Sequence, residues 1–194
     1  MKTSDELPKT FTHTLVGDVV TAETRWRDGN VEVVRRDLIR AVFAAVEGLN
    51  WQLRQGLVAT HSNHLSLNHH EVAALLDETY AVNERGEISP QPRFIPLSSA
   101  IRMVVRIISR IRPEYTMDFG HVGWSLLKKS IEARNRIVHP KSLNDFNVSD
   151  DEVKDALRAF AWFLAYVIEV MREQNADLEV GVDETKSQTS VQKS

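Results

Sequence analysis

Residues 31–57 read VEVVRRDLIRAVFAAVEGLNWQLRQGL, and this stretch is the longest of the helices that the sequence predicts. Its apolar positions recur every three or four residues, at Val31, Val34, Leu38, Val42, Ala45, Leu49 and Leu53. That spacing is typical of a long amphipathic α-helix with one buried stripe. A turn signal at Asp28-Gly29-Asn30 comes just before it, and Gly56 marks its expected end.

Periodic apolar patterns and helix-capping residues predict further helices along the chain. The expected helices span residues 31–57, 69–82, 100–111, 119–138 and 150–174. Three prolines within residues 87–96 predict an extended connector, because proline disfavours helical geometry at its own and the preceding position. The sequence therefore predicts an all-α bundle of about five helices.

The starts of these helices carry recognisable capping residues. Ser149 with Glu152 three residues later forms a capping box for the last helix. The other expected caps are Asn68, Ser98 or Ser99, and Asp118. In the helix at 69–82 the residues expected to face inward are Val72, Leu75, Leu76 and Tyr80.

Three regions follow from this organisation. Residues 1–29 are expected to form an N-terminal arm, with a short strand or irregular structure between Thr14 and Trp26. Residues 30–175 hold the helical domain. Residues 176–194 are polar and lack aromatic side chains, which predicts a disordered C-terminal tail.

Composition narrows the class of protein. The 194 residues include no cysteine, which excludes disulfides, zinc–thiolate sites and thiol nucleophiles and favours a reducing compartment, the cytoplasm. The first residues lack the pattern of a secretory signal. The longest apolar run, Ala159 to Ile168, is shorter than the roughly 20 residues of a membrane span. It predicts a helix buried by several neighbours, at the centre of the bundle or at a dimer interface.

Charge is unevenly distributed along the chain. Residues 93–141 hold ten Lys or Arg and three acidic residues, so this segment is +7 within a chain of net charge −3. A basic segment in an acidic protein is typical of a surface that binds a polyanion. The candidate RNA-contacting residues are Arg102, Arg106, Arg110, Lys128, Arg136 and Lys141. The alternative for the three arginines, spaced four apart, is an ordinary solvated helix face.

One segment carries a set of residues suited to phosphate chemistry, Arg134-Asn135-Arg136-Ile137-Val138-His139-Pro140. Pro140 disfavours helix at His139, so this histidine is expected at the helix end. Arg134 and His139 are about 140° apart on an ideal helix, but arginine is long enough for the two heads to converge. Asn135 lies four residues before His139 and can hydrogen-bond the imidazole.

This segment resembles the R-x(4–6)-H motif of the HEPN superfamily, a group of helical domains that includes bacterial toxins and defence proteins. The motif stands near a helix end, and asparagine fills the usual polar position after the arginine. The surrounding pattern is also similar: a first long helix carrying Glu47, a His-Pro helix end, a polar loop and a hydrophobic last helix. The resemblance covers about residues 30–174.

The resemblance implies a metal-independent endoribonuclease with no cofactor. The ribose 2′-hydroxyl would attack the adjacent phosphate, His139 would move a proton, Arg134 would stabilise the charge on phosphorus, and Asn135 would orient His139 or contact the phosphate. Family members often form homodimers in which two motifs line one cleft. Many are toxins or anti-phage effectors, which implies an antitoxin or a defence partner. Glu47 would reach the motif from the first long helix.

Other interpretations remain open on the sequence. Arg134 and His139 also suit a purely structural role, since cations near a helix C-terminus stabilise the helix dipole. A non-catalytic helical module that binds RNA or protein fits the same pattern. Glu47 also suits the polar edge of its helix. A metal site is a weaker alternative, because the clustered histidines match no standard spacing: His61, His64, His69 and His70.

Overall fold

The structure is a computed structural model that describes residues 10–61, 67–92 and 94–191. These residues form six α-helices, a short 3-10 helix and one two-stranded antiparallel hairpin. The predicted all-α class is confirmed, with one helix more than expected. The chain divides into two compact units: the first takes Met1–Trp51 and Asp118–Leu164, and the second takes Gln52–Met117 and Ala165–Ser194.

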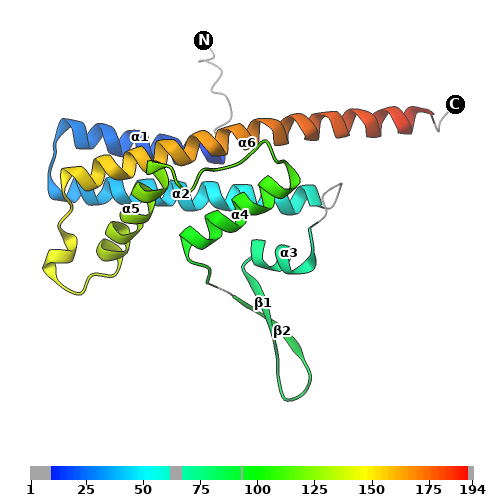
Figure 1. Cartoon of the computed structure of the whole chain (residues 1–194), viewed down its shortest axis with the longest axis horizontal. Helices are drawn as coiled ribbons and strands as arrows, with labels where there is room; N and C mark the ends of the chain where they lie inside the picture. The colour runs from blue at the N-terminus through cyan, green and yellow to red at the C-terminus, as the bar shows by residue number, and fades with distance from the viewer. Residues whose placement is uncertain (1–9, 62–66, 93, 192–194) are drawn as a thin grey trace, which may run out of the picture. The chain divides into compact units, whose positions relative to one another are not determined.

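The first unit is helical throughout its described part. Its elements are α1 (Phe11–Asp28), α2 (Glu32–His61) as far as Trp51, α5 (Val122–Val138), the 3-10 helix η1 (Leu143–Phe146) and the start of α6 (Asp150–Val191). Figure 1 shows α1 and α2 side by side and antiparallel. Large, fully buried side chains come from α2, α5 and α6, including Phe43, Trp124 and Phe163. Each such side chain stabilises the fold by about 1.5–3 kcal/mol.

The α1 helix replaces the strand or irregular arm expected between Thr14 and Trp26. Thr10 caps it, and its Oγ1 accepts a 3.2 Å hydrogen bond from the His13 N–H. Three threonine hydroxyls of the helix, those of Thr14, Thr21 and Thr24, donate to carbonyls four residues earlier, as in the 2.8 Å bond from Thr21 to Gly17. Val19 is the one residue of α1 that is fully buried. Because so little of this helix is buried, its apolar pattern was too weak to predict it.

A close contact joins α5 to α6. The Gly123 backbone passes so near Trp162 that a Cβ atom at position 123 would overlap the indole ring. His121 caps α5 by accepting a 3.0 Å hydrogen bond from the Gly123 N–H, and its ring stacks on Trp162 at 5.9 Å between centroids. The expected start at Phe119 with Asp118 as cap was therefore wrong. Asp118 instead accepts from the Gly120 N–H in the preceding turn.

The second unit contains the one described hairpin of the chain. Its elements are α2 from Gln52 onward, α3 (His69–Leu75), β1 (Glu78–Val82), β2 (Ile88–Pro92), α4 (Leu97–Ile111) and α6 from Ala165 onward. Within this unit the hairpin extends away from α3 and α4 (Figure 1). The apolar face of α4 is buried as predicted at Ile101, Val104, Val105 and Ile108.

The helix expected over residues 69–82 ends early. Asn68 and Glu71 form a capping box at its start, as the sequence signal for Asn68 indicated. At its end Asp77 adopts a left-handed conformation, with φ of 56°. Arg54 holds this end: its Nε donates to the Leu75 carbonyl at 2.7 Å, and its Nη2 forms a 2.7 Å ion pair with Asp77. Contacts from a distant buried arginine thus stop a helix that local periodicity favours.

Residues beyond Asp77 form the hairpin in place of helix. Tyr80 pairs with Pro90 and is 58% exposed, so its predicted inward position was wrong. The loop is held by the Asn83 side chain, whose oxygen accepts from the N–H groups of Arg85 and Glu87. Gly86 supplies the left-handed residue, with φ of 77°. The proline-rich connector is extended as predicted, but its pairing with residues 78–82 was not foreseen.

The last helix begins where the sequence indicated and runs further. Ser149 and Glu152 form the predicted capping box, with the Ser149 N–H donating to Glu152 at 2.9 Å. The helix then continues to Val191, beyond its expected end near Gln174. No proline interrupts residues 175–191. Among the described residues, none of the helices combines the length and apolar character that crossing a membrane requires.

Candidate functional site

The predicted motif lies at the C-terminal end of α5, within the first unit. Arg134 and Asn135 belong to the last turns of the helix, and His139 is its C-cap residue. The His139 backbone N–H donates to the Asn135 carbonyl at 2.9 Å, which completes the final turn. Pro140 follows and cannot continue the helix. The predicted position of His139 at the helix end is confirmed.

Arg134 meets Glu47 of α2, a contact that the family resemblance implied and that the polar edge of a helix would not require. Its Nη2 donates to Glu47 Oε1 at 2.7 Å, and its Nη1 donates to Asn135 Oδ1 at 3.1 Å. The Arg134 side chain is 28% exposed and the Glu47 side chain 44% exposed. The guanidinium is thus oriented by two partners and still reachable from solvent, so a phosphate oxygen can compete with the carboxylate for it.

Asn135 and His139 differ from the expected arrangement. The Asn135 side-chain oxygen accepts from Arg134, and the expected hydrogen bond from Asn135 to the imidazole is not found. His139 is exposed, and within the described residues its ring makes no side-chain hydrogen bond or ion pair. Asn135 therefore orients the arginine here, and the imidazole stands open to solvent and to a ligand.

Arg136 holds the loop that follows the motif. Its Nη2 donates to the Asn147 carbonyl at 2.7 Å and to Glu152 at 2.9 Å, and its Nε donates to the Asp145 carbonyl at 3.3 Å. These contacts join α5 to η1 and to the first turn of α6. The guanidinium is hydrogen-bonded to protein groups, so Arg136 joins these elements, and its expected contact with RNA stays a prediction.

Two carboxylates near Arg136 carry altered pKa values. Burial alone would raise the pKa of Glu152, but hydrogen bonds from the Ser149 N–H and from Arg136 outweigh it and lower the pKa. The pKa of Asp145 is lowered by the backbone N–H groups of Lys141 and Ser142, which donate to its carboxylate at 2.7 Å each. Both groups therefore stay ionised near neutral pH, where they accept these hydrogen bonds in the loop after His139 and at the start of α6.

Two further basic residues of the first unit are exposed. Lys128 lies on α5, and Lys141 lies in the loop after His139. Within the described residues, neither ammonium group forms an ion pair with a carboxylate. They remain candidates for contact with the phosphate backbone of RNA, on the same unit as the motif.

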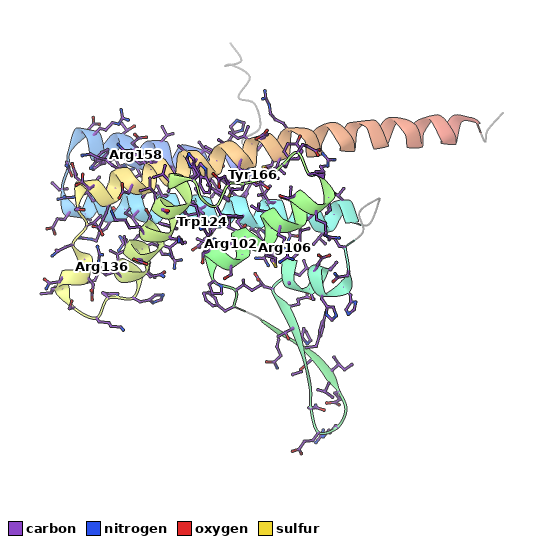
Figure 2. All side chains as sticks on the ribbon, in the orientation of Figure 1. Arg102, Arg106, Trp124, Arg136, Arg158 and Tyr166 are labelled. Carbon is purple, nitrogen blue, oxygen red and sulfur yellow. The ribbon has the colours of Figure 1, made fainter. Side chains whose placement is uncertain are left out.

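The three arginines of α4 belong to the second unit. Arg102 and Arg106 (labelled in Figure 2) are both exposed. Arg110 is held by Glu71 of α3 through two hydrogen bonds, of 2.9 and 2.8 Å. The three line an open groove of about 610 Å³, whose apolar floor includes Met103 and Ile107. The expected common face is present, and one of its three arginines is already paired with a carboxylate.

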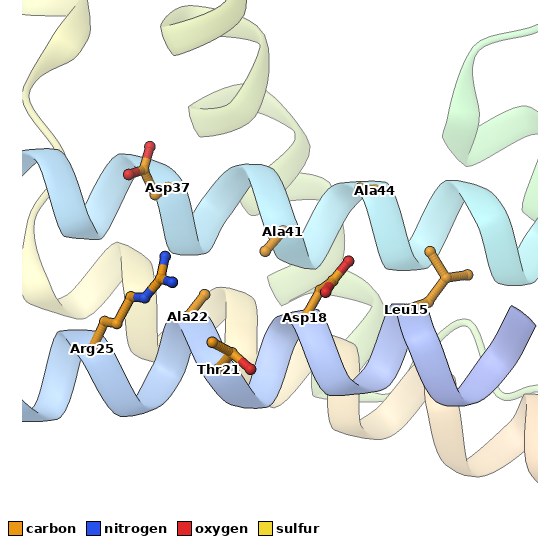
Figure 3. Close-up of a pocket in the computed structure, with 8 residues that line it drawn as sticks. All are labelled: Leu15, Asp18, Thr21, Ala22, Arg25, Asp37, Ala41 and Ala44. Carbon is orange, nitrogen blue, oxygen red and sulfur yellow. The ribbon is translucent and has the colours of Figure 1, made fainter. Parts of the chain in front are cut away.

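A second groove lies between α1 and α2 in the first unit. Leu15, Asp18 and Arg25 reach from α1 toward α2, as Figure 3 shows. The groove has a volume of about 340 Å³ and is lined mainly by small residues on the α2 side, Ala41 and Ala44. Its acidic and basic side chains are mixed, so the groove presents no uniform charge that would select a ligand.

The histidine cluster receives little support as a metal site. His69 and His70 are exposed on α3, with ring centroids 3.8 Å apart. The side chains of His61 and His64 lie outside the described part of the structure. Among the side chains that are described, no group of three or more potential ligands gathers closely enough to hold a metal ion.

Sequence reasoning missed the role of the loop at residues 145–147. The two carbonyls that hold Arg136 carry no sequence signal, since every residue has one. Glu152 was recognisable as part of a capping box, but its ion pair with Arg136 was not predictable.

Comparison with protein-family models, with curated proteins and with solved structures found no match to this chain.

Proposed function

We propose that this protein is a metal-independent endoribonuclease whose catalytic residues are Arg134, Asn135 and His139. The observation that carries the proposal is an arginine oriented by Glu47 and Asn135 at the same helix end as an exposed histidine. The resemblance of this segment to the HEPN motif gives the residues their proposed roles. A guanidinium suits the charge of a phosphodiester, and an imidazole suits proton transfer near neutral pH.

The proposed reaction is an internal transfer within the RNA strand. The imidazole of His139 takes the proton of a ribose 2′-hydroxyl, and the resulting oxygen attacks the neighbouring phosphorus. The bond from phosphorus to the 5′-oxygen breaks, and that oxygen receives a proton from a general acid. The products are a 2′,3′-cyclic phosphate and a free 5′-hydroxyl. Water is not consumed in this step, and no metal ion takes part.

Arg134 is proposed to stabilise the charge that develops on phosphorus. A planar guanidinium matches two phosphate oxygens, and removing one such donor commonly costs about 2.7–4 kcal/mol of transition-state stabilisation. Glu47 holds the guanidinium in place before RNA binds and is then displaced in part by phosphate. Asn135 keeps one edge of the guanidinium oriented during this exchange and has its own amide N–H groups for a phosphate oxygen.

The wider role follows from the resemblance and is proposed with it. Two copies of the chain would supply two histidines, one as general base and the other as general acid. RNA is the substrate, and Lys128 and Lys141 would contact its backbone. A toxin or anti-phage effector working in the cytoplasm, with an antitoxin or a defence partner to restrain it, is the biological setting that these features favour.

The experiment that tests this function is RNA cleavage in EDTA. Purified wild type, Arg134→Ala and His139→Ala are incubated with total RNA and with tRNA, and the fragment ends are analysed. We expect cleavage by the wild type alone, with cyclic-phosphate and 5′-hydroxyl ends. Equal cleavage by all three proteins, or activity abolished by EDTA, would contradict the proposal.

A non-catalytic RNA-binding module is the second candidate. The observation that favours it is the arginine-lined groove on α4, together with the ion pair that gives Arg134 a structural partner. Such a module binds RNA and leaves it intact. Retained binding in His139→Ala, with no cleavage by the folded wild type, would favour this candidate over the ribonuclease.

A further inference from the structure

The two outer edges of the β1–β2 hairpin differ in chemistry. In an antiparallel pair, alternate residues direct their backbone groups toward the partner strand or away from it. The Asn83 N–H donates to the Glu87 carbonyl at 3.1 Å, so these two residues face each other across the hairpin. Every second residue back from Asn83 therefore faces the partner strand, and the residues between them face outward. The outward-facing backbone groups are those of Glu78, Tyr80 and Val82 on β1 and Ile88, Pro90 and Pro92 on β2.

Prolines remove backbone donors from the outer edge of β2 but not from the outer edge of β1. Pro90 and Pro92 have no N–H, so the outer edge of β2 lacks a donor at two of its three outward positions. The outer edge of β1 keeps every donor and acceptor. Within the part of the chain that the structure describes, these groups make no backbone hydrogen bond beyond the hairpin. An open strand edge is a template for another strand.

One face of the hairpin is apolar and exposed. Tyr80, Val82 and Ile88 project from the same face, because their positions are paired or alternate in the register. They are 58%, 67% and 71% exposed, and the opposite face carries polar residues such as Thr79 and Ser89. A two-stranded hairpin with one uncovered apolar face is at best marginally stable in water.

We propose that the β1 edge pairs with β1 of a second copy of this chain. The two strands run antiparallel about a twofold axis at Tyr80, which gives a four-stranded sheet in the order β2–β1–β1–β2. In this register Tyr80 faces the partner's Tyr80, and Glu78 faces the partner's Val82. The outward positions of β1 are therefore self-complementary, and the two glutamates stay apart.

The proline-bearing edges decide the size of the assembly. After pairing, both outer strands are β2, whose edges offer one backbone donor each, that of Ile88, and so disfavour a further strand. The sheet therefore closes as a twofold dimer and does not grow into a filament. The apolar faces of the two hairpins join into one surface. This interface does not rest on the proposed ribonuclease activity, and each can fail without the other.

A cysteine at the axis tests the register directly, because the natural chain has none. Opposed residues in such a pair have Cα atoms about 5.5 Å apart, within reach of a disulfide. We expect full-length Tyr80→Cys to form a covalent dimer on mild oxidation. Ser89→Cys, on the strand away from the axis, should stay monomeric on a denaturing gel. Absence of a Tyr80→Cys cross-link, or equal cross-linking by Ser89→Cys, would overturn the proposal.

A charge exchange tests the pairing of Glu78 with the partner's Val82. Val82→Glu should weaken the dimer about tenfold, since two like-charged pairs then face each other across the axis. Glu78→Lys combined with Val82→Glu should restore dimerisation, because each lysine then faces a glutamate. Sedimentation over a range of concentrations measures this. A wild type that remains monomeric, or a dimer indifferent to both variants, would contradict the interface.

Discussion

Arg134 and Arg136 stand two positions apart on α5 and meet different partners. Arg134 reaches Glu47 on α2 and stays partly exposed, whereas Arg136 binds two backbone carbonyls and Glu152. Local spacing in the sequence placed both on one helix, and the contact with Glu47 was expected only from the family resemblance. It could not separate their roles, because the loop carbonyls that bind Arg136 are positioned by the fold.

Glu47 should restrain Arg134 without contributing much to stability. We expect Glu47→Gln to change the free energy of unfolding by less than about 1 kcal/mol, as is usual for partly exposed ion pairs. RNA affinity should rise roughly two- to fivefold, since the guanidinium no longer exchanges a carboxylate for phosphate. Fluorescence anisotropy with labelled RNA measures this change.

The control for Glu47→Gln is Asp37→Asn, which removes an equal charge from the same helix. Asp37 pairs with Arg40 at 2.9 Å and makes no contact with the motif. Its substitution should leave RNA affinity nearly unchanged. An equal gain in both variants would mean that net charge, and not the Arg134 contact, sets the affinity.

Arg136 should matter for folding more than for binding RNA. We expect Arg136→Ala to lower the free energy of unfolding by about 1.5–3 kcal/mol, because the carbonyls of Asp145 and Asn147 lose their donor and Glu152 loses its cation. Urea unfolding measures this. Lys128→Ala, an exposed cation on the same helix, should stay within about 0.5 kcal/mol of the wild type.

Among the elements, the helices with a strong apolar pattern were predictable, whereas α1, which buries only Val19 fully, and the hairpin were not. The apolar periodicity of residues 31–57 and 100–111 predicted helices close to the observed ones. The Ser149–Glu152 capping box predicted the start of α6. The hairpin was missed because residues 69–82 keep apolar residues at helical spacing. The left-handed Asp77 and its ion pair with Arg54 end the helix, and a contact 23 residues away in sequence leaves no local signal.

The junction of α5 with α6 depends on a residue without a side chain. We expect Gly123→Ala to destabilise the protein by about 1–3 kcal/mol, since the added methyl overlaps Trp162 and forces the helices apart. Thermal unfolding followed by circular dichroism measures the effect. The same change would also loosen the helix that presents Arg134 and His139.

A matched glycine separates packing from helix propensity. Gly17 lies within α1 with no neighbouring atom within 4 Å of an added Cβ, so Gly17→Ala should stabilise the protein by about 0.5–1 kcal/mol. If Gly123→Ala also stabilised the fold, the tight contact with Trp162 would be contradicted.

At the scale of the whole chain, the basic segment at residues 93–141 is shared by both units. Arg102, Arg106 and Arg110 fall in the second unit, whereas Lys128, Arg134 and Lys141 fall in the first. A charge count along the sequence found the basic residues but could not assign them to the two units. The motif itself was predictable, because Arg134, Asn135 and His139 lie within six consecutive residues at one helix end.

The proposed ribonuclease depends on proton transfer by His139, and the rate of single-turnover RNA cleavage measures that step. His139→Ala should slow cleavage by about 100-fold or more at saturating protein, the usual contribution of a positioned acid or base. His13→Ala, which removes another exposed histidine of the first unit, should cleave at the wild-type rate. A His139→Ala protein with a native circular dichroism spectrum and undiminished cleavage would contradict the account.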